Sequence, residues 1–453
     1  MIFKSLCRHA GIGANSYLLK THSAKVVLDA GMHPKHEGLS AVPHYEFLKY
    51  GSADSIIITH SHLDHVGTLP VFLHDQPQAK VFLTPETAEL ASAMLHNSVN
   101  VMQSKRVDHG IAEYPLFEHR ELDEIEEAFE IRNTERPFDL DPVGSVRATF
   151  HDAGHILGSV GVTIEGDGKK IFYTGDVNFE HSTLQKGARF PETTVDALIV
   201  ETTRGEHARK PDYNRGTEEN SLAEAIKNVL ERKGSVLIPV FAMGKTQEVL
   251  GMLHRFKAEG LIPKKTPVYI GGLSTKMTQV YDRFTDQSRR HLAGFRFLKD
   301  MELEAGSKKS KSPIPFLPGC IYALSSGMMS EKTVSNNFAR QGLLENAKHG
   351  LFFVGYADPE TPGGKIRAAQ QGDMITLDPA YPPVKLNCET RIFDFSGHST
   401  RDAIAEYIVK VAPKKVFLVH GDDGAVEWFR GEVMRRLPNT EVIVPEPGVE
   451  YEI

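Results

Sequence analysis

One short segment of the sequence concentrates side chains that bind metal ions. Residues 58–67 contain His60, His62, Asp64 and His65, directly after the apolar run Ser-Ile-Ile-Ile at 55–58. Imidazole nitrogens and carboxylate oxygens are the ligands that zinc and similar divalent metals prefer. His60 and His62 are two residues apart, so they point the same way in extended backbone, and the other two follow a turn. The spacing favours a loop that serves two adjacent metals over a surface loop that is His-rich by chance.

Further candidate ligands occur singly, each at the end of an apolar strand and beside glycine. A lone histidine after a strand is more often structural, so each signal is weak by itself, but together with residues 60–65 they favour one shared site. The carboxylate of Glu201 is the weakest candidate, because an ordinary turn or helix cap would also explain it. The single candidates are His155, Asp176, His398 and His420.

Alternating strands and turns must position these residues. We predict strands over 15–19, 25–29, 55–59, 146–150, 160–165, 170–174 and 197–201, a helix over 86–95, and a solvated, acidic helix face over 118–130. From 204 to about 356 the pattern changes to a doubly wound α/β unit. There we predict a helix over 222–230 that stops at Gly234, a strand over 235–240 and a helix from Thr246. Beyond it we predict a strand over 390–395, a helix over 400–411 and a strand over 415–419.

Composition narrows the class of protein. A chain of 453 residues is too long for one ordinary core, so we expect two domains. No apolar run reaches the roughly 20 residues that a membrane span needs, and the N-terminus does not resemble a secretion signal. The 3 cysteines give no disulfide framework. We therefore expect a cytoplasmic protein without a membrane partner. The net charge of −7 argues against a broadly basic surface but allows a local basic groove.

The combined motifs resemble a known family. The His-x-His-x-Asp-His loop with His155, Asp176 and His420 resembles the dinuclear site of the metallo-β-lactamase superfamily, and Asp29 matches its first, structural aspartate. Residues 234–248, 326–328 and 355–356 resemble the β-CASP branch of RNA-processing nucleases, such as those of cleavage and polyadenylation and their short bacterial counterparts. Glu201, His398 and His420 fall on that branch's motifs A, B and C.

The resemblance implies a fold and a domain order. The fold class is α/β: an αββα metallo-β-lactamase sandwich with an inserted α/β β-CASP domain. The expected boundaries are 1–203 for the first part of the metallo-β-lactamase domain, 204–384 for the β-CASP domain and 385–453 for the last part of the first domain.

The resemblance also implies a zinc site and a reaction. His60, His62 and His155 would hold one zinc ion, Asp64, His65 and His420 a second, and Asp176 would bridge the two. The implied substrate is RNA, because in this family a histidine at motif C accompanies RNA enzymes. Single-stranded RNA is the expected form. Asp64 would orient a bridging hydroxide, and His398, held by Glu201, would protonate the leaving 3′ oxygen. The products would be a 5′ phosphate and a 3′ hydroxyl. Manganese is an alternative metal.

Substrate contacts are the least determined part of the site. The candidates are Lys245, Ser326, Gly327, Met328, Ser396 and Ser399, although the serines could instead cap a helix. The sequence departs from the family pattern at Glu331, Glu360 and Gly364. The basic run Lys308-Lys309-Ser310-Lys311 is either an RNA contact or, more commonly, a solvated loop.

Alternative functions stay open at this point. They are a DNA nuclease, a hydrolase of small esters or thioesters, a 5′–3′ exoribonuclease and a non-catalytic RNA-binding subunit. We expect an endonuclease, because the sequence ends soon after His420. A homodimer is one assembly that the resemblance allows.

Overall fold

The computed structural model describes residues 1–9, 11–305 and 314–453, so the basic run at 308–311 lies outside the described residues. The chain divides into two compact units. Unit 1 comprises Met1–His181, Gly187–Arg209 and His398–Ile453, and unit 2 comprises Ser182–Lys186 and Lys210–Gly397. Residues 385–397 fall in unit 2 because β19 (Glu389–Ile392) pairs in parallel with β16 (Gly350–Phe353).

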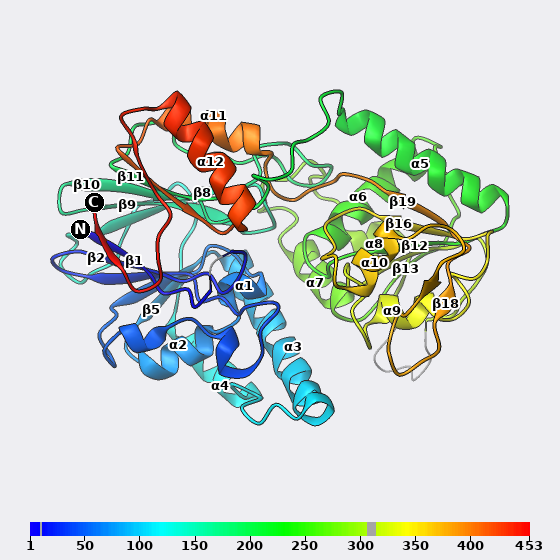
Figure 1. Ribbon diagram of the computed structural model, residues 1–453, viewed down its shortest axis with the longest axis horizontal. Helices are drawn as coiled ribbons and strands as arrows, with labels where there is room; N and C mark the ends of the chain where they lie inside the picture. The colour runs from blue at the N-terminus through cyan, green and yellow to red at the C-terminus, as the bar shows by residue number, and fades with distance from the viewer. Residues whose placement is uncertain (10, 306–313) are drawn as a thin grey trace. The chain divides into compact units, whose positions relative to one another are not determined.

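Unit 1 is built on two sheets. The first has the strand order β22-β1-β2-β3-β4-β5-β6, and the second has the order β21-β20-β11-β10-β9-β8-β7. The N-terminal strand β1 pairs with the C-terminal strand β22, so the two ends of the chain lie side by side (Figure 1). The strands are β1 (Ile2–Ser5), β2 (Tyr17–Lys20), β3 (Lys25–Leu28), β4 (Ser55–Ile57), β5 (Lys80–Leu83), β6 (Phe129–Ile131), β7 (Phe138–Asp139), β8 (Arg147–Asp152), β9 (Val160–Gly166), β10 (Lys169–Tyr173), β11 (Ala197–Glu201), β20 (Lys415–Val419), β21 (Glu441–Ile443) and β22 (Glu450–Glu452).

The two sheets face each other and carry helices on their outer faces (Figure 1). Buried side chains of both sheets, such as Phe3, Ile57, Phe150 and Phe417, form one apolar cluster between them. A second cluster packs the outer face of the first sheet, and a third packs α11 and α12 on the second. The predicted αββα sandwich is therefore confirmed. Its helices are α1 (Leu63–Val66), α2 (Leu69–Asp75), α3 (Pro85–His109), α4 (His119–Ile125), α11 (Arg401–Val411) and α12 (Asp423–Arg436).

Two predictions of local structure in unit 1 need correction. The helix predicted over 86–95 begins where expected, because Thr84 caps it by accepting a hydrogen bond from the Thr87 N–H. It continues to His109 and ends at Gly110, whose φ of 70° is left-handed. The acidic stretch 118–130 is not one helix face. It contains α4, a short 3₁₀ turn, and then β6, because Phe129 and its neighbours extend the edge of the first sheet by pairing with β5.

Unit 2 is the predicted α/β unit. Its main sheet is parallel, with the strand order β14-β13-β15-β12-β16-β19 among the described residues. The strands not yet given are β12 (Val236–Pro239), β13 (Val268–Ile270), β14 (Leu303–Ala305), β15 (Ile321–Leu324), β17 (Met374–Ile375) and β18 (Val384–Lys385). The helices are α5 (Arg215–Glu231), α6 (Lys245–Ala258), α7 (Leu273–Arg283), α8 (Phe297–Asp300), α9 (Val334–Ala339) and α10 (Pro362–Ala368).

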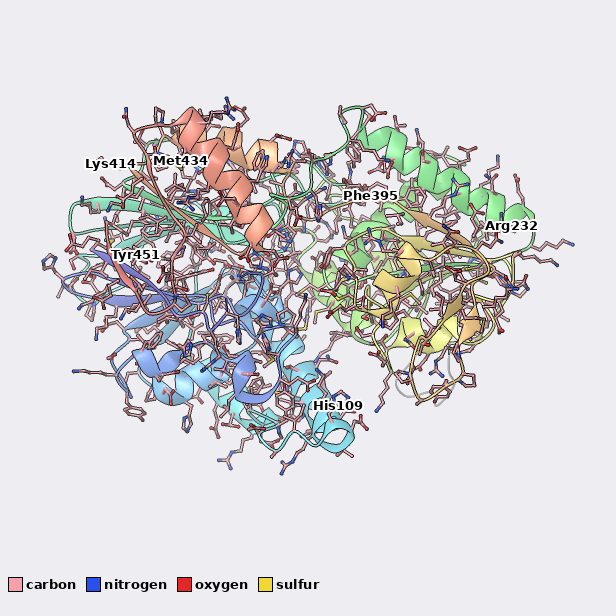
Figure 2. The ribbon with its side chains drawn as sticks, viewed as in Figure 1. His109, Arg232, Phe395, Lys414, Met434 and Tyr451 are labelled. Atoms are coloured by element: carbon pink, nitrogen blue, oxygen red, sulfur yellow. The ribbon has the colours of Figure 1, made fainter. Side chains whose placement is uncertain are left out.

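The end of α5 differs from the prediction in one detail. The left-handed residue after the helix is Lys233, with φ 58°, rather than Gly234. Gly234 is instead required by packing, because a Cβ at that position would lie 1.8 Å from the Lys348 carbonyl oxygen. Arg232, labelled in Figure 2, pairs with Glu389 at 2.6 Å and so ties this end of the helix to the region of β19.

A buried ionic network inside unit 2 holds the short segment Ser182–Lys186. The carboxylate of Glu248 accepts hydrogen bonds from the N–H groups of Thr183 and Leu184 at 2.7 and 2.9 Å, and it also pairs with Arg215.

No helix among the described residues is long and apolar enough to cross a membrane.

Candidate metal centre

The candidate ligands of unit 1 are brought together by the ends of adjacent strands. Strands β10, β11 and β20 are neighbours in the second sheet, with β11 parallel to both. The carboxyl ends of parallel strands meet at one edge, which places Asp176, Glu201 and His420 near each other. The loop after β4 supplies His60 and His62 from the facing sheet.

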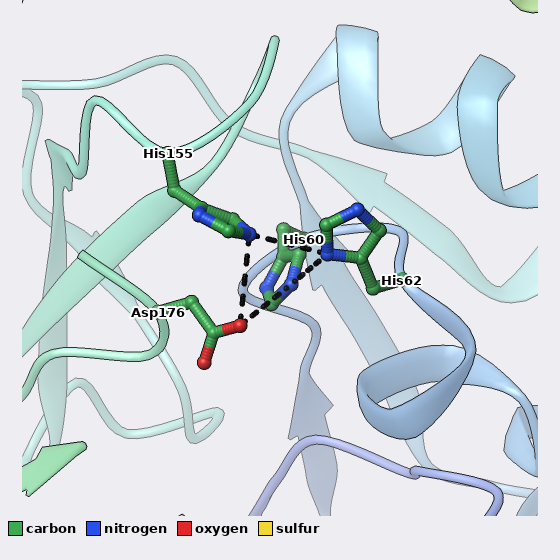
Figure 3. A group of neighbouring side chains, drawn as sticks. All are labelled: His60, His62, His155 and Asp176. Carbon is green, nitrogen blue, oxygen red and sulfur yellow. Dashed lines mark hydrogen bonds and ion pairs between the residues drawn. The ribbon is translucent and has the colours of Figure 1, made fainter. Parts of the chain in front are cut away.

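The first group contains His60, His62, His155 and Asp176, whose side chains converge on one point (Figure 3). Nδ1 of His62 lies 3.1 Å from Nε2 of His60 and 3.1 Å from Nε2 of His155. Oδ2 of Asp176 lies 3.5 Å from His60 and 3.6 Å from His155. Zinc–nitrogen bonds of about 2.0–2.1 Å in a tetrahedral site place ligand atoms about 3.3 Å apart, so the group fits such an ion.

The second group contains Asp64, His65 and His420. Nε2 of His420 lies 3.2 Å from Oδ2 of Asp64. The other oxygen of Asp176, Oδ1, lies 3.2 Å from His65 and 3.1 Å from His420. Asp176 therefore presents one oxygen to each group, which is the arrangement expected of a bridging carboxylate.

Two features of these residues fit positive charge supplied by metal ions. Oδ1 of Asp176 is buried and accepts no hydrogen bond within the described residues, although two imidazole nitrogens are close to it. Burial lowers the pKa of His420, but Asp176 and Asp64 outweigh burial and raise that pKa to about 10. The carboxylates thus favour a cation here, and a metal ion competes with the proton for such ligands.

A third group lies beside the first. Nδ1 of His398 lies 3.0 and 3.2 Å from the two carboxylate oxygens of Glu201, and its Nε2 lies 3.9 Å from Oδ2 of Asp176. Since a carboxylate can only accept, Nδ1 carries the hydrogen and donates to Glu201. Burial lowers the pKa of His398, but Glu201 and Asp176 outweigh it, so the pKa is raised above its usual 6.5.

Residues that sequence reasoning missed surround these groups. Thr203 Oγ1 lies 3.1 Å from Nδ1 of His420, and the Asn15 amide lies 3.1 Å from Nε2 of His65. Tyr173 donates to Asp29, the aspartate expected to be structural. The one available signal for Tyr173 was its place at the end of a buried strand, where a tyrosine hydroxyl needs a partner.

The candidate substrate residues fall in different local settings. In unit 1, Ser399 is fully buried; its hydroxyl accepts from the Phe179 N–H at 2.8 Å and its N–H donates to the Val177 carbonyl. Thr400, and not a serine, caps α11. In unit 2, the Lys245 ammonium donates to the carbonyl of Phe395, which Figure 2 labels.

The remaining candidates belong to unit 2. Ser326 Oγ accepts from the Ser330 N–H, and the Met328 carbonyl accepts from the Gly363 N–H at 2.9 Å. Gly327 packs against Phe241, and Ser396 is half-buried just before the end of the unit.

The three departures from the family pattern, Glu331, Glu360 and Gly364, lie in unit 2. A Cβ at Gly364 would lie 2.0 Å from the Asp358 carbonyl oxygen, so this backbone has no room for a side chain at that position. Lys365, the next residue, is exposed, and so are Glu331 and Glu360. The exposed ammonium of Lys365 thus stands one position after Gly364.

An αββα sandwich with imidazole and carboxylate groups at one edge of its sheets defines the metallo-β-lactamase class of proteins. Comparison with known families agrees. The model of the metallo-beta-lactamase superfamily matches residues 10–226, a Beta-Casp domain matches 246–366, and a Zn-dependent metallo-hydrolase RNA specificity domain matches 383–445. By these matches the chain contains a metallo-β-lactamase domain and a β-CASP domain.

Curated relatives are similar along most of this chain. The cleavage and polyadenylation specificity factor subunit 3 of Dictyostelium discoideum is 27% identical over 96% of the chain and 55% of the relative. The transcription termination factor FttA of Methanosarcina mazei is 29% identical over 94% and 68%. The endoribonuclease ysh-1 of Neurospora crassa is 27% identical over 93% and 52%. The chain thus spans about half to two thirds of the length of these relatives.

A solved structure agrees in fold. A protein of unknown function from Enterococcus faecalis V583 superposes with a TM-score of 0.58, covering 99% of both chains at 12% sequence identity.

Proposed function

We propose that this protein is a two-metal hydrolase that cleaves phosphodiester bonds inside RNA chains. The observation that carries the proposal is the Glu201–His398 pair next to Asp176, because a hydrolase needs an acid beside its metal-binding groups to protonate the leaving oxygen. The match to an RNA specificity domain and the names of the relatives support RNA as the substrate.

The first group would hold one zinc ion and the second group another, with Asp176 shared between them. When bound, the two metals supply Lewis acidity toward a phosphate and make water a nucleophile near neutral pH. The carboxylate of Asp64, which is partly exposed beside His420, would orient the attacking water.

His398 would act as the general acid. Its Nδ1–H is held by Glu201, so its Nε2 faces the side of Asp176 where the phosphate would lie. Nε2 then gives a proton to the leaving 3′ oxygen, and the products are a 5′ phosphate and a 3′ hydroxyl. Lys245, Ser326, Gly327 and Met328 remain proposed RNA contacts of unit 2.

Cleavage of matched substrates tests this function. Zinc-loaded protein is incubated with an internally labelled single-stranded RNA and with DNA of the same sequence. We expect internal cuts in RNA alone and a loss of about 10²–10⁴-fold in kcat for His398→Ala, with metal content unchanged. Mapping of the new ends checks the 5′ phosphate and 3′ hydroxyl.

Three results would contradict the proposal. Equal cleavage of DNA would remove RNA specificity, and release of single nucleotides from the 5′ end would indicate an exonuclease. No cleavage by protein with two bound metals would indicate a different substrate class, for which small esters and thioesters are the first to assay. Reconstitution with manganese in parallel tests which metal supports the reaction.

A further inference from the structure

The carboxylate of Asp29 accepts hydrogen bonds from Thr59, His65 and Tyr173 behind the candidate metal centre. It is fully buried, and its Oδ1 accepts from the N–H of Thr59 at 2.7 Å. The Thr59 hydroxyl donates to the same carboxylate at 2.9–3.0 Å. Asp29 also has left-handed backbone, with φ 61°, which is rare for a residue other than glycine and marks a position fixed by its surroundings.

Two further donors share the second oxygen of Asp29. Nδ1 of His65 lies 2.8 Å from Oδ2, and the hydroxyl of Tyr173 lies 2.7 Å from the same atom. Because a carboxylate only accepts, His65 carries its hydrogen on Nδ1 and its Nε2 presents a lone pair. That Nε2 is the atom 3.2 Å from Oδ1 of Asp176. Asp29 therefore determines which nitrogen of His65 is available to a metal.

The Tyr173 hydroxyl has no role in the chemistry described above. Its side chain is 2% exposed at the end of β10, three residues before Asp176. Burial and the nearby Asp29 raise the pKa of Tyr173 well above its usual value, so the phenol stays neutral and remains a hydrogen-bond donor. Its hydrogen bond to Asp29 links β10 to the carboxylate behind His65.

We propose that Tyr173 is a positioning residue for the second metal group: its hydroxyl holds the Asp29 carboxylate against His65. The inference rests on the proposed two-metal centre. It adds the prediction that loss of the Tyr173 hydroxyl affects the two metal groups differently. Without the Tyr173 hydroxyl, Oδ2 keeps the hydrogen bonds from His65 and Thr59 but loses its donor from β10, and the carboxylate gains freedom to turn. Among the described residues, the first group is linked to Asp29 through Thr59, whose hydroxyl lies 3.2 Å from Nδ1 of His60, so it should be affected less.

Zinc titration against a chromophoric chelator tests the proposal without relying on activity. Metal-free wild-type protein should bind two ions in two steps. Tyr173→Phe should keep the first step and lose about 10–100-fold in affinity at the second, the usual effect of removing an outer partner of a ligand. His65→Ala removes a candidate ligand of the second group, so the zinc-binding step that it weakens is the one that belongs to that group.

Tyr407→Phe is the matched control. Tyr407 is also buried, at 7% exposure, and its hydroxyl donates to the Pro191 carbonyl at 2.9 Å, with no contact to the candidate ligands. Tyr407→Phe also removes one tyrosine hydroxyl from unit 1. Because that hydroxyl does not contact the candidate ligands, both zinc-binding steps should be unchanged. Thermal unfolding of each metal-free variant reports whether folding is intact.

A double-mutant cycle separates positioning from general packing. If Tyr173 acts through Asp29, then Tyr173→Phe in an Asp29→Asn background should add no further loss of zinc affinity. An additive loss, an equal weakening of both steps, or wild-type affinity in Tyr173→Phe would overturn the inference. Those results leave the proposed nuclease function intact, whereas a wild-type protein that binds no zinc would overturn both.

Discussion

At the scale of single residues, the protonation of His398 governs the proposed reaction. A general acid works only in its protonated form, and an imidazole with the usual pKa of 6.5 is mostly neutral at pH 7.5. The carboxylates of Glu201 and Asp176 raise the pKa of His398 despite its burial. These two carboxylates therefore extend the pH range over which His398 stays protonated.

The pH profile of RNA cleavage should show this effect. Because the folded pKa of His398 is raised, the rate should stay high through neutral pH and fall as pH rises through that pKa. Glu201→Gln removes the largest raising charge, so its descending limb should move to lower pH while zinc content stays unchanged. A limb at the same pH in both proteins would assign the titration to another group.

At the scale of elements, close approach of backbones fixes the ligand loop. The Asn15 N–H donates to the Asp64 carbonyl at 2.9 Å, and the backbone of Gly31 lies against both of these groups. A Cβ on Gly31 would lie 1.9 Å from the Asp64 carbonyl oxygen and 2.5 Å from the Asn15 nitrogen, and both contacts are with backbone that cannot move aside easily. Glycine is therefore required next to α1.

Gly31→Ala should displace the loop that carries Asp64 and His65. We expect a loss of about 1–3 kcal/mol in the free energy of unfolding, typical of overpacking, together with weaker zinc binding. Gly431→Ala in α12 is the matched control, because a Cβ there has nothing within 4 Å and should be neutral or slightly stabilising. Denaturant unfolding and the zinc titration measure both effects. Unchanged zinc affinity in Gly31→Ala would contradict this account of the loop.

At the scale of the whole molecule, the chain alternates between its two units. Ser182–Lys186 belongs to unit 2 although the residues on both sides belong to unit 1. Inside unit 2 this segment is held by the buried Glu248. Burial raises the pKa of Glu248, but Arg215 and two backbone N–H groups lower it by more. Its lowered folded pKa means that Glu248 contributes stability above its usual pKa of 4.5, which is lost as pH falls through the folded value.

Glu248→Gln should release this segment. Removing one partner of a buried charge pair costs about 3–5 kcal/mol, so unit 2 should unfold at lower denaturant. Limited trypsin digestion should then cut after Lys186, a site that the native segment protects. Glu231→Gln is the control, since Glu231 is exposed and pairs with Lys227 at a distance of 3.8 Å. Equal digestion of the two variants would show that Glu248 does not hold the segment.

Local sequence patterns predicted where the candidate ligands lie along the chain. The run His60 to His65 follows an apolar strand, and the single candidates each follow another strand, so spacing and hydrophobic pattern were enough to predict loops with candidate ligands at strand ends. The same patterns predicted an αββα sandwich and an α/β insertion. Local rules set strand starts and helix caps well, as at Thr84, but not the length of α3 or the edge strand β6, which depend on distant partners.

Long-range packing sets which distant groups meet, and local patterns do not record it. Tyr173 and Asp29 are 144 residues apart, and their hydrogen bond exists because two strands of facing sheets bring them together. The orphan oxygen of Asp176 and the left-handed backbone of His420 likewise arise from long-range packing. Spacing along a chain records which residues can share a loop, but contacts between loops are set by the pairing of strands and the packing of layers.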